Sequence, residues 1–398
     1  MRKIEVLLFD NTVGYLYVDK DVFSFEYDNK WLETNSIFDF DPNIYPYKGR
    51  QYPENDIFGF IKDSLPDRFG RLLLDEEEKR KASEENRLPR KLTELDYLLK
   101  INDLTRVGAF QFKDEKGNLC SLEDDAVPPY IYLRDIESAS IDFEKNGSFD
   151  KETYRRLLLP GSSLGGARPK ANIYFNDELW IAKFPSINDG YDLEAWEKIA
   201  TDLARLCEIE VCDTKLEKYS ELGSTLLIKR FDRDGGKRIH YSSFLNMLSV
   251  EDGENSNYSY LDLVGFVRAT FGSAQLVEDS LLELYKRTVF NYLINNTDNH
   301  LRNNGLLYKN GMWTLSPMFD INPTFFTSSF ALNATQDGYS KDIIIDSARY
   351  YLIDKETAEE IYKKFYNTIK NNLRSINQKY KVRQKEIEIL DNILDSRK

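Results

Sequence analysis

Residues 295–304 read NNTDNHLRNN, a run of polar side chains between a long apolar segment and a predicted strand. Asp298 and Asn303 stand five positions apart in this run. In the catalytic loops of phosphoryl-transfer enzymes, an Asp at this spacing accepts the proton of a hydroxyl group while the Asn reaches a metal ion. The alternative is a cluster of Asx turns, because Asn and Asp are favoured in loops whatever their function.

A second acidic residue follows at the end of a short apolar strand. Residues 315–321 read LSPMFDI, and Asp320 comes about twenty residues after the Asp298/Asn303 pair. Mg²⁺ prefers one or two carboxylates together with phosphate oxygens and water, so Asp320 and Asn303 would suffice as its protein ligands. Asp320 could instead be the N-cap of a short helix ahead of Asn322.

A glycine-rich segment lies upstream, where residues 161–170 read GSSLGGARPK. The three glycines allow backbone N–H groups to face a phosphate, and Arg168 and Lys170 add positive charge. The pattern is neither a Walker A loop nor GxGxxG, so a plain surface turn is the alternative.

A lysine ends the second predicted strand after this loop. Lys183 belongs to the apolar stretch IAKFP, where an ammonium group is costly to bury unless an anion meets it. In kinase-like folds such a lysine contacts the nucleotide phosphates and is oriented by a helix glutamate. Glu194 and Glu197 lie one turn apart on the next predicted helix. A lysine whose ammonium reaches solvent at a sheet edge is the alternative.

The composition is that of a globular protein with an acidic balance. The 398 residues include 54 Lys and Arg against 67 Asp and Glu, a net charge of −13, with 41% hydrophobic and 30% charged residues. This balance excludes wholesale disorder, and at roughly 100–200 residues per domain the length predicts two or three domains. The negative charge argues against a broad nucleic-acid surface but allows a small basic pocket for one nucleotide.

Cysteine content and hydropathy indicate the compartment. Cys120, Cys207 and Cys212 are odd in number and lack CxxC spacing, so neither a disulfide framework nor a zinc site is expected. No secretory h-region follows Met1, and no apolar run approaches the roughly 18 residues that cross a bilayer. We expect a soluble, cytoplasmic protein without membrane contact.

Hydrophobic periodicity predicts a mixed chain that becomes mainly helical after residue 242. Strands are predicted over residues 4–9, 13–18, 22–27, 109–113, 171–175, 179–184, 225–231, 305–308 and 313–316, and helices over residues 65–81, 93–101, 194–206, 261–270, 281–295, 358–372 and 384–394. The charged run 75–81 (DEEEKRK) and residues 379–398 are predicted to be solvent-exposed helix. The glycine-rich loop, strand lysine, helix glutamate, Asp/Asn loop and strand-end Asp follow the chain order of a two-lobed phosphotransferase.

Together these segments resemble the HipA family of serine/threonine protein kinases, over essentially the whole chain. Residues 13–32 and 65–74 resemble the family's N-terminal subdomain, and residues 106–110 (RVGAF) resemble its Val-Gly-Ala strand. The other matching segments are 163–171 (SLGGARPKA, phosphate loop), 230–233 (RFDR, hinge), 297–303 (TDNHLRN, catalytic loop) and 316–320 (SPMFD, metal-binding motif).

The resemblance implies an α+β, two-lobed, protein-kinase-like fold. It divides the chain into an N-terminal subdomain (1–104), a small antiparallel β N-lobe with the glycine-rich loop and hinge (105–240), and a mainly helical C-lobe with the catalytic loop and metal site (241–398). The implied reaction is transfer of the γ-phosphoryl group of ATP, with Mg²⁺, to a Ser or Thr hydroxyl of a protein.

The resemblance also implies a role for each matching residue. The catalytic set is Asp298 as base with Lys183 and His300, while Asn303 and Asp320 hold Mg²⁺. The implied ATP-binding residues are Ser163, Gly165, Gly166, Ala167, Arg168, Lys170, Lys183, Glu197, Lys229, Arg230, Phe231 and Asp232. Within this set Lys183 contacts the α- and β-phosphates, residues 229–231 receive adenine through their backbone, and Asp232 lies on the ribose side. The side chains of residues 183, 298, 303 and 320 are expected to converge on one triphosphate.

Some positions depart from the family pattern. Arg302 replaces the usual lysine, Lys229 replaces an acidic residue, and Trp196 replaces the Asn before the helix glutamate, so Glu194 stays an alternative to Glu197. Family members commonly autophosphorylate a serine of the glycine-rich loop, for which Ser163 is the better match and Ser162 the next.

The family's biology implies partners as well. It implies a toxin neutralised by a small HipB-like helix-turn-helix antitoxin, with DNA contacted only through that partner. The substrate would be a protein, such as an aminoacyl-tRNA synthetase or another translation component. Two alternatives remain open: a catalytically weak pseudokinase that acts as a binding or co-repressor module, and a kinase-fold enzyme that acts on a lipid or small molecule or transfers an adenylyl group.

Overall fold

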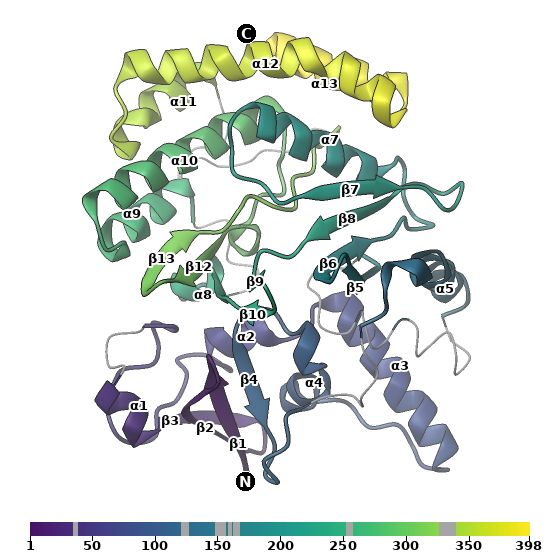
Figure 1. Ribbon diagram of the computed structural model, residues 1–398, viewed down its shortest axis with the longest axis vertical. Helices are drawn as coiled ribbons and strands as arrows, with labels where there is room; N and C mark the ends of the chain where they lie inside the picture. The colour runs from purple at the N-terminus through teal and green to yellow at the C-terminus, as the bar shows by residue number, and fades with distance from the viewer. Residues whose placement is uncertain are drawn as a thin grey trace. The chain divides into compact units, whose positions relative to one another are not determined.

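The computed structural model describes residues 1–34, 39–120, 127–147, 157, 161, 168–251, 258–325 and 340–398. The chain forms two compact units, which are Met1–Asn188 with Leu227–Ser242, and Asp189–Leu226 with Ser243–Lys398 (Figure 1). The domain boundaries predicted at residues 104 and 240 stay a prediction.

The first unit contains strands β1 to β6, β9 and β10 together with helices α1 to α5. Their bounds are β1 (Arg2–Leu8), β2 (Asn11–Asp19), β3 (Val22–Tyr27), β4 (Phe110–Lys113), β5 (Lys170–Phe175), β6 (Glu178–Lys183), β9 (Arg233–Asp234), β10 (Lys237–Arg238), α1 (Asn29–Thr34), α2 (Gly59–Ser64), α3 (Arg68–Glu84), α4 (Glu94–Lys100) and α5 (Leu133–Asn146). Two further strands include the unit boundary, β8 (Thr225–Lys229) and β11 (His240–Ser243).

The second unit is mainly helical, as the sequence predicts. Its elements are α7 (Leu193–Leu206), β7 (Thr214–Glu217), α8 (Phe244–Met247), α9 (Tyr260–Thr270), α10 (Ala274–Leu293), β12 (Gly305–Lys309), β13 (Met312–Leu315), α11 (Lys341–Ser347), α12 (Lys355–Tyr380) and α13 (Gln384–Ser396). Among the helices described, none combines the length and the apolar character needed to cross a bilayer.

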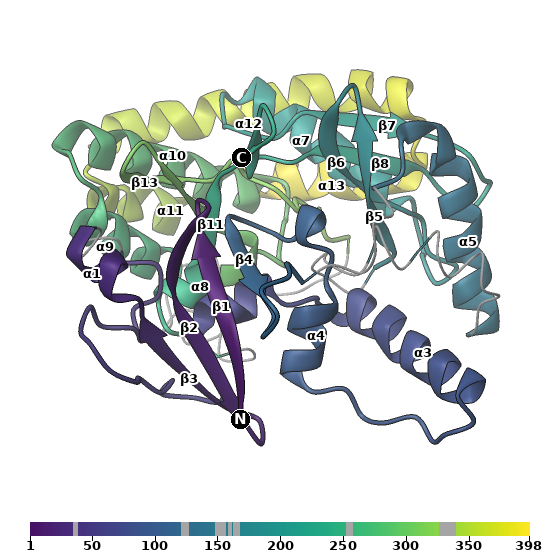
Figure 2. The ribbon, with the colours of Figure 1, turned by 60° about the horizontal axis from the view of Figure 1, so that its bottom comes forward.

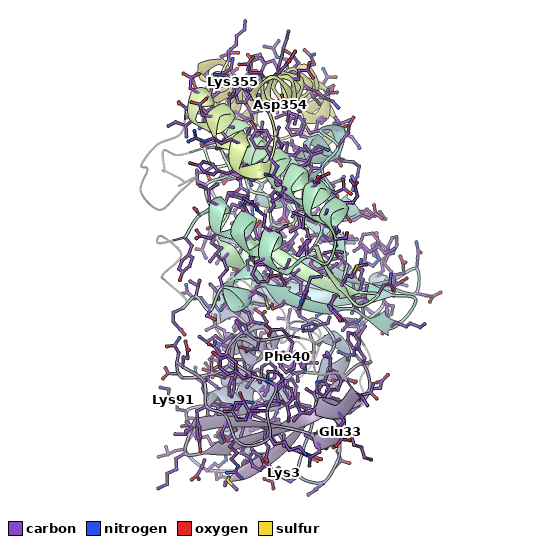
Figure 3. The ribbon with its side chains drawn as sticks, turned by 90° about the vertical axis from the view of Figure 1, so that its left-hand side faces the viewer. Lys3, Glu33, Phe40, Lys91, Asp354 and Lys355 are labelled. Carbon is purple, nitrogen blue, oxygen red and sulfur yellow. The ribbon has the colours of Figure 1, made fainter. Side chains whose placement is uncertain are left out.

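The predicted N-terminal meander is confirmed as an antiparallel sheet with the order β3-β2-β1-β4, in which β1 and β2 lie side by side (Figure 2). Its buried face packs on a cluster of aromatic rings. The ring of Phe40 lies 5.1 Å from that of Phe110 and 5.4 Å from that of Phe60, and Phe40 is fully buried. Figure 3 shows Phe40 inside this part of the chain and Lys3 near its edge. Burial of these large rings is the main stabilising term for a sheet of this size.

Arg106 is a fully buried cation at the start of the RVGAF segment. Its guanidinium donates hydrogen bonds to the carbonyl oxygens of Ser64 (3.2 Å), Leu98 (2.8 Å) and Ile101 (3.4 Å), which lie at the C-terminal ends of α2 and α4. Helix C-termini carry partial negative charge and therefore stabilise a cation. Desolvation still lowers the pKa of Arg106 to about 10. Two helix ends thus fix this segment in place.

The prediction of a solvent-exposed helix over residues 75–81 is wrong for two of its acidic residues. Glu77 is 3% exposed and forms ion pairs with Lys81 and Lys100, both at 2.8 Å. Glu78 is 4% exposed and pairs with Arg87 at 2.5 Å. Because Lys100 and Arg87 lie 23 and 9 positions away along the chain, helical periodicity could not reveal these pairs.

Two predicted hairpins are confirmed, and their turns have the backbone conformation that the turn residues favour. Asn176 and Asp177 join β5 to β6 with φ of +52° and +61°. Asn310 and Gly311 join β12 to β13 with φ of +52° and +80°. Asn, Asp and Gly adopt this left-handed region at low cost, which is why two-residue hairpin turns use them. Strand β8 extends the first hairpin in the order β5-β6-β8.

Each predicted helix is found at its expected position in the chain, but some of the helix boundaries differ from the prediction. Helix α10 begins at Ala274, seven residues before the predicted start, with Ser273 as its N-cap. Helix α5 was not predicted, although it buries Ile136 and Phe143 and ends at Gly147 with φ +66°. The prediction that residues 379–398 are exposed is wrong for α13, whose buried residues include Ile387, Leu390 and Leu394.

Candidate active site

The predicted catalytic loop lies in the second unit, between the end of α10 and β12. It begins at Asn295, whose φ of +57° ends the helical path, and it closes with a 3-10 turn over Leu301–Asn303. The Asn303 amide nitrogen donates a hydrogen bond to the Asp298 carbonyl oxygen at 2.9 Å. This bond orients Asn303 so that its nitrogen is used within the loop, and no donor in the described part of the chain reaches its Oδ1.

Asp298 carries an accessible carboxylate with a raised pKa. The side chain is 78% exposed, and its Oδ1 lies 3.9 Å from His300 Nε2. Protein atoms around the carboxylate remove part of its hydration, and this raises the pKa of Asp298. The carboxylate of Asp320 raises it further, while His300 opposes the shift. A raised pKa makes an aspartate a better proton acceptor than an ordinary surface carboxylate.

Asp320 is the second carboxylate of this region, and its backbone is in the left-handed conformation with φ +56°. Asn322 Nδ2 donates to Asp320 Oδ1 at 3.1 Å. The preceding segment is fixed by backbone hydrogen bonds from Ser316 N to Gly305 O and from Met318 N to Glu210 O, both 2.8 Å. Asp tolerates this conformation better than most residues, and such backbone outliers occur often at functional sites.

The donor set fits magnesium. Asp320 offers carboxylate oxygens and Asn303 offers an amide oxygen, the hard ligands that Mg²⁺ prefers. Among the described residues, no group of three His, Cys, Asp or Glu side chains is arranged as a metal site. Magnesium does not need one, because it usually keeps one or two protein ligands beside phosphate oxygens and water.

A network of buried and half-buried amides around Tyr260 holds the loop in place, and this network was not predicted from the sequence. The Tyr260 hydroxyl accepts hydrogen bonds from Asn291 Nδ2 (2.7 Å) and from Asn299 Nδ2. Asn304 Nδ2 donates to Asn299 Oδ1 at 3.1 Å, and Asn296 Nδ2 donates to Asn291 Oδ1 at 2.9 Å. Burial raises the pKa of Tyr260 to about 12, so its hydroxyl stays neutral at physiological pH.

The start of the loop is also joined to the segment after Asp320. Asn295 Nδ2 donates to the Thr324 carbonyl at 2.6 Å, and the hydroxyls of Thr297 and Thr324 lie 2.7 Å apart. Arg397 Nη2 donates to Asn295 Oδ1 at 2.8 Å. These bonds keep the backbone around Asp298 close to the chain that follows Asp320. Asn295 and Thr297 belong to the predicted motif, whereas no pattern in the sequence around Thr324 or Arg397 indicated that these residues contact the loop.

The predicted phosphate-binding lysines are brought together in the first unit. Lys170 of β5 and Lys183 of β6 are directly opposite one another in the antiparallel register. Side chains of opposed residues point to the same face of a sheet, and like charges in this position repel one another. Arg168 lies two residues before β5 and is half-buried.

The predicted hinge contains a buried ion cluster. Asp232 Oδ1 accepts from Arg230 Nε (2.9 Å), and Oδ2 accepts from Arg230 Nη2 (2.6 Å), Arg233 Nη1 (2.9 Å) and Gly108 N (2.8 Å). Burial alone would raise the pKa of Asp232, but the two guanidinium groups outweigh it and hold the pKa well below its ordinary value. Gly108 has φ +72°, and a Cβ there would lie 3.2 Å from Tyr241 N, so the position needs glycine.

The remaining hinge side chains also have partners within the first unit. Lys229 forms an ion pair with Glu178 at 2.6 Å, and the ring of Phe231 lies 5.7 Å from that of Tyr241. Arg230 donates further hydrogen bonds to Asn172 Oδ1 and to the Thr105 carbonyl, both at 2.7 Å. The hinge side chains therefore stabilise the unit itself, and only the backbone of this segment is left as the predicted contact with adenine.

The two candidate glutamates lie on α7 in the second unit. Glu194 is 2% exposed and Glu197 is 4% exposed, and both follow the N-cap Asp192. Both stay candidates for the predicted contact with Lys183. Of the predicted phosphate loop, Ser162, Ser163, Gly165, Gly166 and Ala167 lie outside the described residues.

Comparisons with known proteins agree with the sequence motifs. A family model described as the HipA-like C-terminal domain matches residues 162–373, and one described as the HipA N-terminal domain matches residues 4–101. A curated relative from Sinorhizobium fredii (strain NBRC 101917 / NGR234), Y4dM, bears the word kinase in its name. It is 27% identical over 177 residues, and the chain spans only 39% of its length and aligns over 42% of its own.

Among solved structures, HipA of the Shewanella oneidensis MR-1 toxin–antitoxin system, in a complex with HipB and operator DNA, matches with a TM-score of 0.70 and 17% identity. The match covers 98% of this chain and 95% of that one. A Helicobacter pylori proinflammatory kinase, CtkA, gives a TM-score of 0.45 at 17% identity over 59% of this chain and 89% of that one. The first match confirms the predicted α+β, kinase-like fold.

Proposed function

Because the chain belongs to the HipA family, we propose that it is an ATP- and Mg²⁺-dependent protein kinase that phosphorylates a serine or threonine hydroxyl. The observation that supports this proposal most is the arrangement around Asp298. Its carboxylate is accessible and has a raised pKa, Asn303 is oriented by the Asp298 carbonyl, and Asp320 lies close enough to affect the Asp298 pKa.

Each residue has a defined task in the proposed reaction. The hydroxyl oxygen of the substrate attacks the γ-phosphorus of ATP, the bond to the β,γ-bridging oxygen breaks, and ADP leaves. Asp298 accepts the hydroxyl proton, and His300 stabilises its charged form beforehand. Lys183 and Lys170 bind phosphate oxygens, and the hinge backbone at residues 229–231 receives adenine.

Asn303 and Asp320 would hold magnesium, which when bound neutralises charge on the β- and γ-phosphate oxygens. Little covalent chemistry is required of the protein, because phosphoryl transfer depends on positioning and on stabilised charge. The buried amides around Tyr260 contribute by fixing the loop before substrate arrives.

A toxin role with an antitoxin partner is part of the proposal. The solved relative from Shewanella forms its complex with HipB and operator DNA. By analogy we expect a small helix-turn-helix partner that inhibits this chain and contacts DNA for it. The net charge of −13 supports indirect contact with DNA, because direct binding requires a clustered basic surface.

Labelled ATP tests the proposed reaction. The purified full chain is incubated with Mg²⁺ and either γ-labelled or α-labelled ATP, with and without a cell extract as substrate. We expect γ-label in protein and equimolar ADP. Label from the α-position would indicate adenylyl transfer, and bound ATP without any transfer would indicate a pseudokinase; either result contradicts the proposal.

The autophosphorylation site is tested separately. Ser163→Ala should remove most of the phosphate that mass spectrometry finds on the chain, and Ser162→Ala serves as the matched control. Phosphate that persists at Ser162 in the first variant would assign the site to the neighbouring serine instead.

A further inference from the structure

Trp196 is a fully buried side chain at an unusual position on α7. It lies between Glu194 and Glu197, the two candidates for orienting the phosphate-binding lysine, and none of its surface is exposed. A large indole at this point of the helix must be accommodated by other elements of the second unit. Its contacts therefore determine where this turn of α7 can lie.

The indole N–H of Trp196 donates a hydrogen bond to Glu386 Oε2 of α13 at 2.7 Å. The two residues are 190 positions apart, and Glu386 is 8% exposed. A buried carboxylate and a buried N–H each lose hydration, so each depends on the other as a hydrogen-bond partner. Arg383, on the exposed side at 3.9 Å, is the other charged group facing the carboxylate in the described chain.

The ring of Trp196 packs on its other side against Phe325. The ring centroids are 4.7 Å apart with an interplanar angle of 63°, an edge-to-face arrangement. Phe325 also contacts Tyr191 ahead of α7, at 5.0 Å and 84°. Such aromatic contacts favour a narrow range of geometries. The indole is thus confined both by packing and by a directional hydrogen bond.

Further bonds join α7 to the C-terminal helices. Helix α12 contacts both α7 and α13, and Figure 1 shows it beside them. Tyr380 donates to Asp202 Oδ2 at 2.6 Å, and Lys198 pairs with the same carboxylate at 2.5 Å. Arg383 donates to the Gly190 carbonyl at 2.8 Å, just before α7 begins. The Trp196–Glu386 bond starts from the turn that carries the candidate glutamates.

We propose that Trp196 and Glu386 are positioning residues for phosphoryl transfer, which act by fixing the turn of α7 that carries Glu194 and Glu197. This inference rests on the proposed kinase function. It assigns the C-terminal helix α13 a role in catalysis, because without the Glu386 acceptor the indole loses its directional contact and this turn of α7 loses a bond that fixes its position. A displacement of about 1 Å can cost on the order of 100-fold in rate.

Three variants separate this role from simple stabilisation. Glu386→Met keeps the volume but removes the acceptor, Glu386→Gln keeps an oxygen acceptor without charge, and Trp196→Phe keeps the ring packing but removes the donor. We expect Glu386→Met and Trp196→Phe to lower kcat by about 10–100-fold, and Glu386→Gln to stay within about threefold of wild type. Rates are compared per folded molecule, below the unfolding temperature of every variant.

The control is Tyr366→Phe, which removes another hydrogen bond to α13, donated by Tyr366 of α12 to Asp395 at 3.2 Å. It should leave kcat unchanged. Because Trp196 is proposed to act through a glutamate, Trp196→Phe should add less than about twofold in a Glu197→Gln or a Glu194→Gln background.

The outcomes are distinct. Absence of phosphoryl transfer by the wild-type chain would contradict the proposed kinase function itself. Transfer by the wild type, combined with unchanged kcat in folded Glu386→Met, would overturn only the present inference. Equal losses in Glu386→Met and Glu386→Gln, or full additivity of Trp196→Phe in both glutamate backgrounds, would also overturn it.

Discussion

Asp232 and Asp298 both lie beside basic side chains, yet their surroundings give them opposite properties. Asp232 is buried and accepts four hydrogen bonds from two arginines and a backbone N–H, and its pKa is lowered. Asp298 is exposed, has a histidine at 3.9 Å, and its pKa is raised. A motif carboxylate whose oxygens are saturated by buried donors, as in Asp232, is therefore a poorer candidate for chemistry than an accessible one such as Asp298.

This contrast changes how the hinge motif RFDR is interpreted. The family resemblance places Asp232 on the ribose side, and that role stays a prediction. In the structure, the Asp232 oxygens are engaged by Arg230, Arg233 and Gly108. The ion cluster keeps the backbone of residues 229–231 in one conformation, which is what a segment that binds adenine through its backbone requires.

The largest expected effect on stability is that of Asp232→Asn. Removing this carboxylate leaves the buried Arg230 and the half-buried Arg233 without their counter-charge, so we expect a loss of about 3–5 kcal/mol in the free energy of unfolding. Urea denaturation, with hydrogen exchange of β4 as a local probe, measures it. The control is Glu208→Gln, which removes an exposed ion pair with Lys364 and should cause no measurable change. An equal loss of unfolding free energy in both variants would contradict the stabilising role assigned to Asp232.

The pH dependence of stability should differ in sign at the two sites. The folded-state pKa of Asp232 lies below the unfolded value, so its contribution is present above about pH 4 and is lost as the pH falls through the folded pKa. The folded-state pKa of Asp298 lies above the unfolded value, so its ionisation lowers stability as the pH rises through that pKa. The test is to measure the denaturation midpoints of wild type, Asp232→Asn and Asp298→Asn as a function of pH. If both substitutions change the pH dependence of the midpoint in the same direction, the prediction is refuted.

The smallest expected effect is a slight stabilisation by Asp298→Asn at neutral pH. The substitution removes repulsion between the carboxylates of Asp298 and Asp320, but solvent screens an exposed side chain. We expect a gain of about 0.2–0.5 kcal/mol in the free energy of unfolding. A measured loss above about 1 kcal/mol would mean that Asp298 has a structural role like that of Asp232.

The features that the sequence predicted well are local. Both hairpin turns depend on two adjacent residues, and the helix at residues 94–100 depends on the capping box of Thr93 and Asp96. The candidate site was predictable for the same reason, because Asp298 and Asn303 lie in one short loop. The structure adds that Lys170 pairs with Lys183, a register that follows from the two-residue turn at Asn176 and Asp177.

The features that the sequence did not predict depend on residues that are distant from one another along the chain. In the helix expected to be exposed at residues 75–81, Glu77 pairs with Lys100 and Glu78 pairs with Arg87. Glu386 likewise accepts a hydrogen bond from Trp196, 190 positions away. Helix α5 contains several Ser and Asp residues, which have low helix propensity, and its amphipathic packing outweighs them. No periodic pattern in one segment can reveal an ion pair or hydrogen bond to another.

The role of Asp298 as the catalytic base is tested by the single-turnover rate of phosphoryl transfer from saturating Mg·ATP, measured for wild type and Asp298→Asn. Asparagine keeps the size of the side chain but cannot accept the hydroxyl proton, so we expect the rate to fall by about 10²–10⁴-fold while ATP affinity changes little. A variant that transfers phosphate at the wild-type rate would contradict the assignment of this loop as the catalytic centre.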